Sequence, residues 1–356
     1  MTVPAPRGPR LRELGVRIGR YDAGPENAIT DVADITVGHV TIWRDEPDPP
    51  AGRGVGRSGV TVILPGELAT RAAEPLPAGT AVLNGAGELT GSIEIRELGA
   101  IYSPVCLTAT MAVGRVYDGA VAAAVAADPR VGVDDVVIPV VGECDDSWLS
   151  EARVVQVEPD DVGRALASAT GGAVAEGAVG AGTGMVAFGY KAGIGTASRT
   201  LPRAGATLGV LVLANFGARR DLVVDGVPVG KLLGGAGARE SAGSCIAVVA
   251  TDAALGTHEL TRIARRCGLG LARAGSVAYN GSGEIFLALS TNTGDPRPAG
   301  AAELNELFAA TVEATEEAVL NALWAAPDVV GREGRLAPGI PHDDVLPLLR
   351  EHGRLG

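Results

Sequence analysis

Histidine and cysteine are scarce, and neither occurs in the spacing of a metal site. There is no HExxH pair and no CxxC pair, so we expect no metal and no cofactor. The G-x-S-x-G elbow of α/β hydrolases is also missing. A Ser-His-Asp triad stays open, although no histidine lies in a strand-end loop rich in turn residues. The histidines are His39, His258, His342 and His352, and the cysteines are Cys106, Cys144, Cys245 and Cys267.

Long apolar runs and an excess of positive charge are absent as well. No stretch approaches the ~20 apolar residues that span a bilayer, and residues 1–7 lack the apolar segment of a signal peptide. The sequence has 30 basic and 42 acidic residues, a net charge of −12, and no basic run. We therefore expect no membrane partner and no nucleic-acid partner. Because cysteines without metal or CxxC spacing are by default reduced, buried thiols, a cytoplasmic protein is predicted.

Aromatic residues make up only 3% of the 356 residues, whereas glycine contributes 51. A chain of this length buries a large core, and its many small residues are typical of a tightly packed α/β body. Residues 1–25 are polar and rich in Pro and Gly, so we expect a loosely held arm. Apolar patterning predicts strands at 27–32, 35–40, 58–65, 104–110, 136–141, 207–215 and 244–252, and helices at 116–127, 160–170, 258–274 and 301–325.

The most informative stretch is 241–252, in which a glycine-rich approach ends at Gly243-Ser244 and an apolar, β-branched strand follows. The Ser244 hydroxyl can attack the carbonyl of Gly243. Hydrolysis of the resulting ester leaves Ser244 with a free α-amine, which can act as a base for its own hydroxyl without any histidine. The alternative interpretation is that Gly243-Ser244 is only the point at which a core strand begins.

Other polar residues lie at predicted strand ends. An asparagine that closes a strand, Asn215, can donate its amide to an oxyanion. Ser282 and Glu284 stand two apart at the start of a strand and therefore share a face. Three acids follow a buried strand, where such residues commonly form only a solvated turn: Glu143, Asp145 and Asp146.

Several motifs occur in a specific order and spacing. They are residues 27–32, 59–65, 84–91, 180–199, 214–217, 243–244, 248–252 and 280–284. Together they resemble the L-aminopeptidase/D-esterase family, the DmpA-type self-processing aminopeptidases of peptidase family S58, which include β-peptidyl aminopeptidases. The resemblance covers roughly residues 15–350.

The resemblance implies a fold and a set of roles. The fold is a four-layer αββα sandwich, with the layout of amino-terminal-nucleophile hydrolases but a different connectivity, formed by residues 1–356 as one domain. Cleavage between Gly243 and Ser244 would give an α chain (1–243) and a β chain (244–356) that stay together and assemble into a homo-oligomer of αβ units. The implied roles are nucleophile for Ser244, oxyanion hole for Asn215, positioning of the nucleophile and its amine for Ser282 and Glu284, and recognition of the substrate ammonium for Glu143.

One position departs from the family pattern. Two residues after Glu143 the best-known members carry a tyrosine with a catalytic role, and this chain has Asp145. We place Asp145 among the catalytic candidates, and Asp146 and Trp148 among the substrate-binding ones. Because two carboxylates are added beside Glu143, we expect a preference for substrates with extra positive charge, or a basic first residue, over alanyl substrates.

The predicted reaction is acyl transfer to Ser244 followed by hydrolysis, which releases amino-terminal residues from small peptides, amides or esters. Two other classes stay open: an unprocessed homologue that binds an amine-bearing ligand, and an acyltransferase of the ornithine-acetyltransferase type. The replaced tyrosine is the only hint of the first class. Serine, rather than threonine, after the cut argues against the second.

Overall fold

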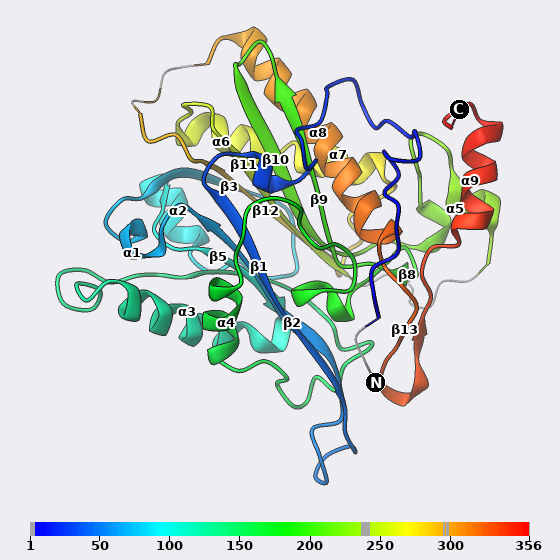
Figure 1. Ribbon diagram of the computed structural model, residues 1–356, viewed down its shortest axis with the longest axis horizontal. Coiled ribbons are helices and arrows are strands. Elements are labelled where there is room, and N and C mark those ends of the chain that lie inside the picture. The colour runs from blue at the N-terminus through cyan, green and yellow to red at the C-terminus, as the bar shows by residue number, and fades with distance from the viewer. Residues whose placement is uncertain (1–3, 236–242, 295, 297–298, 356) are drawn as a thin grey trace.

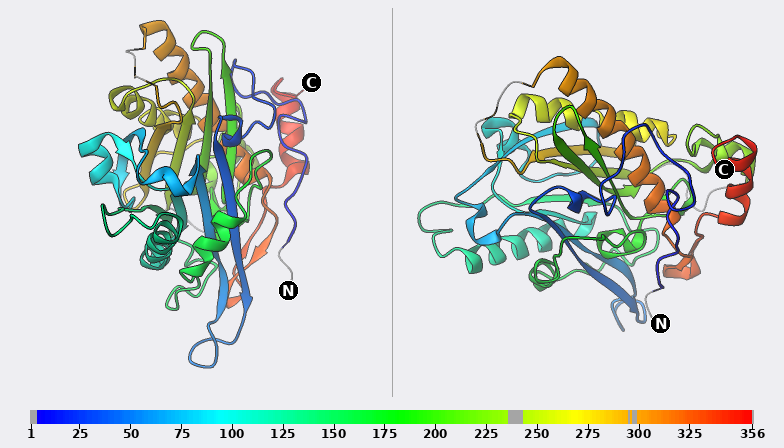
Figure 2. Two further views of the ribbon diagram at one scale, coloured as in Figure 1. Left: turned by 60° about the vertical axis from the view of Figure 1, so that its left-hand side comes forward. Right: turned by 45° about the horizontal axis from the view of Figure 1, so that its top comes forward.

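The computed structural model describes residues 4–235, 243–294, 296 and 299–355. Two β-sheets lie face to face, and helices cover the outer face of each, as the right-hand view of Figure 2 shows most clearly (Figures 1 and 2). This arrangement confirms the predicted four-layer αββα sandwich. Residues 236–242, the last part of the glycine-rich approach to the Gly243-Ser244 bond, lie outside the described residues.

The first sheet has four strands in the order β1-β2-β5-β6, antiparallel except for the parallel pair β5-β6. Helices α3 (Val113–Ala127) and α4 (Asp160–Ala167) cover its outer face. Val60 and Val62 on the sheet pack against Val116 and Val162 on these helices. The strands are β1 (Ile35–Asp45), β2 (Val55–Pro65), β5 (Val105–Ala109) and β6 (Val140–Cys144).

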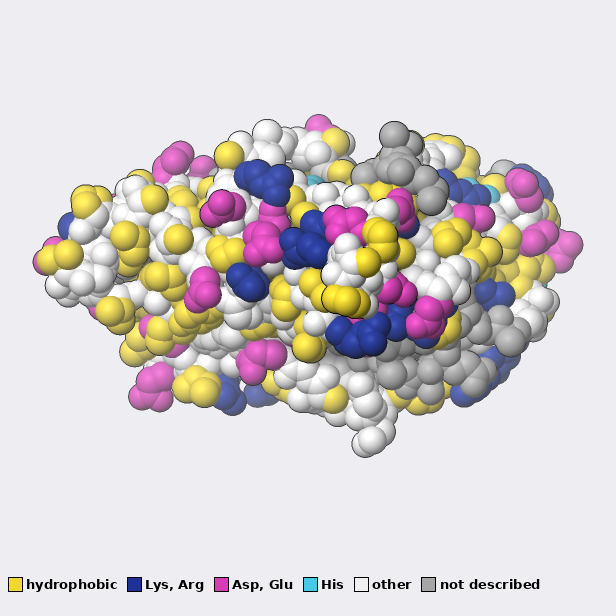
Figure 3. Space-filling view, turned by 90° about the horizontal axis from the view of Figure 1, so that it is seen from below, with side chains coloured by type: hydrophobic (Ala, Val, Ile, Leu, Met, Phe, Trp, Pro, Cys, Tyr) yellow, Lys and Arg dark blue, Asp and Glu magenta, His cyan; other side chains and the backbone are white. Residues whose placement is uncertain are grey.

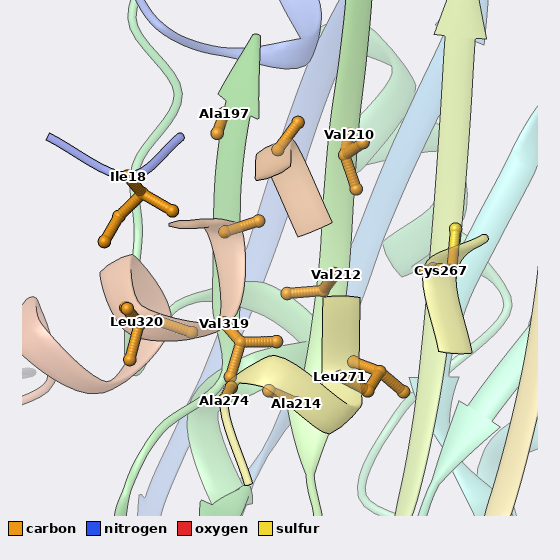
Figure 4. Close-up of a cluster of buried hydrophobic side chains, with 14 of the residues drawn as sticks. Ile18, Ala197, Val210, Val212, Ala214, Cys267, Leu271, Ala274, Val319 and Leu320 are labelled. Atoms are coloured by element: carbon orange, nitrogen blue, oxygen red, sulfur yellow. The ribbon is translucent and has the colours of Figure 1, made fainter. Parts of the chain in front are cut away.

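The second sheet has six strands in the order β4-β3-β12-β11-β10-β9, in which only β11 and β12 run parallel. Helices α6 (Thr257–Ala264), α7 (Cys267–Arg273) and α8 (Ala301–Trp324) cover its outer face. Figure 4 shows the small aliphatic side chains that fill this interface. The strands are β3 (Leu76–Gly85), β4 (Ala100–Ile101), β9 (Ile194–Leu201), β10 (Ala206–Asn215), β11 (Ser244–Thr251) and β12 (Gly283–Ser290).

Alternation along the central strands decides which side chains meet between the two sheets. Leu211 and Leu213 of β10 and Ile246 and Val248 of β11 belong to the core between the sheets, whereas the residues between them face the helices. Successive side chains of a strand point to opposite faces. The same period therefore directs Asn215 and Ser244 to the inner side of the sheet and Cys245 to the helix side.

Shorter elements complete the chain, and no helix of the described residues is long and apolar enough to cross a membrane. On the face shown in Figure 3, Lys and Arg side chains lie among Asp and Glu side chains. The remaining helices are α1 (Leu68–Arg71), α2 (Ser92–Leu98), α5 (Val229–Leu233) and α9 (His342–Glu351), and the remaining strands are β7 (Val186–Ala187), β8 (Tyr190–Lys191), β13 (Val329–Val330) and β14 (Leu336–Ala337).

Three predicted elements are divided, wrong or shifted. The helix predicted at 258–274 is two helices, α6 and α7, separated by a turn at 265–266. Residues 27–32 are not a strand but contain a 3-10 turn, Ile29–Asp31, because the Asp31 carboxylate accepts hydrogen bonds from the backbone of Glu26 and Ala28. Such local bonds compete with strand pairing. The strand predicted at 136–141 begins only at Val140, directly after Pro139, which has no backbone N–H to give to a sheet.

The amino-terminal arm is held firmly, so the prediction of a loose arm is also wrong. Its apolar residues Leu11, Val16 and Ile18 are at most 1% exposed and belong to the core beneath α8. Arg12 forms a two-pronged ion pair with Glu317 of α8 at 2.9 and 2.6 Å. The sequence pattern concealed this attachment because the partner lies about 300 residues away.

Glu317 is the anchor of this attachment, since it also accepts a 2.7 Å hydrogen bond from the fully buried Arg199. Replacing Glu317 with Ala leaves Arg199 with one carboxylate partner among the described residues, Glu313 at 3.6 Å, beside its two backbone carbonyl acceptors. We expect the free energy of unfolding to fall by about 3 kcal/mol, because the buried Arg199 charge loses its closest carboxylate. Urea denaturation measures this loss. The control is Arg17→Ala, which breaks a solvent-exposed pair with Asp22, and equal losses for the two variants would contradict the account.

Candidate active site

Three strand ends meet at Ser244, the first residue of β11. Asn215, the last residue of β10, is its cross-strand partner on one side, and Gly283, the first residue of β12, is its partner on the other. Ser244 is 4% exposed. Because directly opposed residues hold their Cβ atoms about 5 Å apart, the register places the Asn215 amide beside the Ser244 hydroxyl on the inner face.

Ser282 and Glu284 lie next to the Gly243–Ser244 peptide bond. The Gly283 backbone N–H donates a 3.1 Å hydrogen bond to the carbonyl oxygen of Gly243, and the Ser282 hydroxyl donates to the Glu284 carboxylate. Glu284 is paired with Cys245, so alternation sets its side chain on the helix side, opposite to the Ser244 hydroxyl. Burial raises the pKa of Glu284.

The Asn215 amide is fully buried and fixed at both ends. Its Oδ1 accepts a 2.9 Å hydrogen bond from the Val186 backbone N–H, and its Nδ2 donates a 3.0 Å hydrogen bond to the Asp145 carbonyl oxygen. These bonds decide which end of the amide is the donor. Since a primary amide has two N–H donors, one remains for another acceptor.

Glu143, near the end of β6, holds its carboxylate in a defined position. One oxygen accepts a 2.9 Å hydrogen bond from the Glu88 backbone N–H, and the other accepts from the Thr110 hydroxyl. Burial raises the pKa of Glu143, and the nearby Asp145 charge raises it further, while the two hydrogen bonds oppose the shift. A cation bound beside Glu143 would stabilise its ionised form.

An open cleft of about 400 Å³ connects these residues. Among the described residues, its lining contains the acidic residues Glu88, Glu143 and Asp145 and no Lys, Arg or His. A concave site with charge of one sign concentrates ligands of the opposite sign, so the cleft favours amines and other cations. The lining residues are Ala86, Gly87, Glu88, Thr110, Glu143, Asp145, Gly243, Ser244 and Gly281.

Comparison with known proteins identifies the family. The model of peptidase family S58 matches residues 27–337. The chain belongs to peptidase family S58. It is 40% identical, over 96% of its length and 91% of the relative's, to the β-peptidyl aminopeptidase BapA of Sphingosinicella xenopeptidilytica. The predicted family membership and the predicted hydrolase are thereby confirmed.

Two solved structures share this architecture over nearly the whole chain. The L-aminopeptidase D-Ala-esterase/amidase of Ochrobactrum anthropi, described as a new variant of the Ntn hydrolase fold, superimposes with a TM-score of 0.90 at 37% identity, covering 98% of this chain and all of that one. A β-aminopeptidase of Burkholderia sp. superimposes with a TM-score of 0.87 at 41% identity, covering 97% of this chain and 99% of that one.

Two predicted substrate-binding residues of this S58 chain do not line the cleft. Asp146 points away from it, is 4% exposed, and packs beside Ser58 and Ser150. Trp148 lies under the guanidinium of Arg335, 4.5 Å from the ring centre. Although these residues follow Asp145 closely in the sequence, the turn after β6 directs them into the body of the protein.

Sequence reasoning missed Thr110 and Glu88, which hold the Glu143 carboxylate. The only signal was the glycine-punctuated stretch 84–91, whose motif indicates close backbone approach. A Cβ atom added to Gly87 would lie 3.0 Å from the Glu143 carboxylate oxygen, and one added to Gly283 would lie 2.6 Å from the Ala86 carbonyl oxygen. These glycines allow the 84–91 loop to reach both Glu143 and the start of β12.

Asp146 gives this region a pH-dependent stability. Burial raises the pKa of Asp146 to about 7, whereas an aspartate in an unfolded chain titrates near about 4. Between these values the folded protein binds more protons than the unfolded chain, so the contribution of Asp146 to stability falls as pH rises. We expect Asp146→Asn to flatten the decline in unfolding free energy between about pH 5 and about pH 7.5.

Chemical denaturation at the two pH values measures this difference. Asp134→Asn, at an exposed carboxylate, is the matched control and should keep the slope of the unmodified protein. An unchanged slope in Asp146→Asn would show that Asp146 is ionised in the folded protein and would contradict this account.

Proposed function

We propose that this S58 hydrolase is a self-processing serine aminopeptidase that acts through an acyl-enzyme on Ser244. The observation that carries the proposal is the meeting of Ser244, Asn215 and the Ser282–Glu284 pair at adjoining strand ends, beside an acidic cleft. The relative BapA, which is 40% identical to this chain, supports the proposal because it is a β-peptidyl aminopeptidase. Its substrates would be small peptides, amides or esters with a free amino group.

Self-cleavage creates the catalytic group. The Ser244 oxygen attacks the Gly243 carbonyl carbon, the peptide nitrogen leaves as the α-amine of Ser244, and an ester joins the two residues. Water then hydrolyses this ester, which gives residue 243 a carboxylate and releases the hydroxyl. The products are the proposed α chain (1–243) and β chain (244–356).

The mature enzyme would use the new α-amine as its base. A free α-amine has a pKa of about 8, and partial burial lowers it toward neutrality. The amine accepts the hydroxyl proton as the Ser244 oxygen attacks the substrate carbonyl, and the Asn215 amide donates to the oxyanion. Ser282 and Glu284, which lie beside the 243–244 bond, would orient the amine. Water hydrolyses the acyl ester after the first product leaves.

Glu143 would select substrates with a free amino terminus. Its carboxylate lines the cleft with Ser244 and is held by Thr110 and the backbone of Glu88. A charge-assisted hydrogen bond from an ammonium group to such a carboxylate is stronger than a neutral one. Exopeptidase activity follows if this contact holds the substrate with its first carbonyl at Ser244.

Intact mass and denaturing gel analysis test self-processing. The purified protein should appear as two chains split after Gly243 instead of one chain of 35.9 kDa. Ser244→Ala removes the attacking oxygen, so this variant should stay in one piece and lose activity toward aminoacyl anilides by at least about 10⁴-fold, the loss typical for an essential nucleophile.

Ser244→Cys and Ser150→Ala are the matched controls. The thiol keeps a nucleophile, so Ser244→Cys should retain some processing. Ser150 is a buried serine near Asp146 that does not line the cleft, and its replacement should leave processing intact. A Ser244→Ala protein that is still cut after Gly243, or still hydrolyses the anilides, would refute the proposal.

The acidic cleft also predicts a preference for basic first residues. Asp145 adds a carboxylate to the lining that holds Glu143, so a lysyl anilide should be turned over with a higher kcat/KM than an alanyl anilide at low salt. Asp145→Asn should reduce the lysyl-to-alanyl ratio about tenfold, which corresponds to ~1.4 kcal/mol of electrostatic attraction.

Asp146→Asn is the control for this preference, because the Asp146 side chain lies outside the cleft. It should leave the lysyl-to-alanyl ratio unchanged. An alanyl preference that persists at low salt, or equal effects of the two substitutions, would contradict the electrostatic explanation.

We further propose a cytoplasmic location and a homo-oligomer of αβ units. The four cysteines are buried free thiols, which fits a reducing compartment. Apolar side chains at the surface support association, since Val82, Leu83 and Ile93 are each more than half exposed.

A further inference from the structure

Lys191, in the short strand β8, is a fully buried cation that pairs with no carboxylate of the described residues. Its Nζ instead donates to three backbone carbonyl oxygens, those of Gly182, Met185 and Ala192, at 2.9, 2.8 and 2.6 Å. Burying an amine costs free energy unless its donors are satisfied. The three carbonyl oxygens match the three N–H donors of a lysine ammonium group.

The three carbonyl groups favour the ammonium form of Lys191. A neutral amine has only two N–H donors, whereas the ammonium has three and can satisfy every acceptor. Burial lowers the pKa of Lys191, and the carbonyl dipoles oppose this shift. The segment that contains Gly182 and Met185 is therefore held by a charged group rather than by packing alone.

One of these carbonyl groups leads directly to the active site. The Met185 carbonyl and the Val186 N–H are the two ends of one peptide group. Lys191 donates to the carbonyl end, and the N–H end donates to Oδ1 of Asn215 at 2.9 Å. Val186 and Lys191 are also cross-strand partners in the β7–β8 ribbon, and the N–H of the next residue, Ala192, donates a 3.1 Å hydrogen bond to the same Met185 carbonyl.

We propose that Lys191 is a positioning residue that orients and polarises the Asn215 amide through the Met185–Val186 peptide group. Hydrogen bonds in a chain strengthen one another. A cation on the Met185 carbonyl makes the Val186 N–H a stronger donor, which draws electron density toward the Asn215 Oδ1 and makes its Nδ2 hydrogens more acidic. The gain is largest when a negative oxyanion forms, so Lys191 should act on the transition state more than on substrate binding. This inference rests on the proposed oxyanion role of Asn215.

Lys191→Met tests the inference, since methionine keeps the length of the side chain and removes its charge. We expect kcat per processed Ser244 terminus to fall by about tenfold or more. This loss should be smaller than the ~10²–10³-fold loss expected when the Asn215 donor itself is removed. KM should stay within about twofold, because uniform substrate binding is unaffected. If Lys191→Met does not fold, Lys191→Gln, which retains a neutral donor, takes its place.

Arg199→Met controls for the loss of a buried cation. Arg199 is also fully buried and donates to two backbone carbonyl oxygens, those of Ser198 and Ile18, at 2.6 and 2.9 Å. Within the part of the chain that the structure describes, its side chain makes no hydrogen bond to residues 182–186 or to Asn215. Its replacement should lower the melting temperature at least as much as Lys191→Met, with kcat of the folded enzyme unchanged. Equal losses of kcat in both variants would reduce Lys191 to a purely structural residue and overturn the inference.

A double-mutant cycle with Asn215→Ala separates this inference from the proposed function. Lys191→Met should add no further loss of kcat once Asn215 is gone, because both act through one group. Additive losses would overturn the Lys191 inference while leaving the role of Asn215 intact. If Asn215→Ala alone keeps full kcat, the oxyanion role itself fails, and the Lys191 inference falls with it.

Discussion

The register of the three central strands is the constraint on which the rest of the site depends. β10 ends at Asn215, β11 begins at Ser244 and β12 begins at Gly283, and these residues are paired with one another. A slip of one residue would turn every side chain of β11 to the opposite face. The Ser244 hydroxyl would then face the helices, and Cys245 would face the cleft. Side chains of β10 and β11 alternate between the core that separates the two sheets and the core beneath the helices, and their packing in both cores fixes this register.

Around this register, the end of β6 in the four-stranded sheet and the loop after β3 in the six-stranded sheet supply the charges. Glu143 and Asp145 come from the end of β6, and Glu88 comes from the loop after β3, so the cleft lies where the two sheets meet. The chemistry is divided between the faces of the six-stranded sheet. The Ser244 hydroxyl and the Asn215 amide lie on the inner face, whereas the Glu284 side chain, which accepts from Ser282, lies on the helix side. Self-cleavage would join the two by releasing an amine between them.

Much of this arrangement could be predicted from the sequence, because strand ends and alternation are local properties. Ser244, Asn215 and Glu143 were found as polar residues at the ends of apolar runs, and the family motifs gave the four layers. Long-range contacts left no such signal. Nothing in the pattern of residues 1–25 indicates that Arg12 reaches Glu317, and nothing around Asp146 shows that its side chain turns inward. The contacts of Lys191 could not be predicted for the same reason. Its partners are backbone carbonyl oxygens, which every residue type has.

The central claim is that a residue made terminal by scission becomes the nucleophile of an acidic, amine-binding cleft. Labelling the purified enzyme with a serine-directed sulfonyl fluoride, followed by peptide mass analysis, tests it most directly. The account predicts one adduct, on the Ser244 oxygen of a peptide whose α-amine is free. An adduct on another serine, or an adduct on Ser244 within an uncut chain, would contradict it.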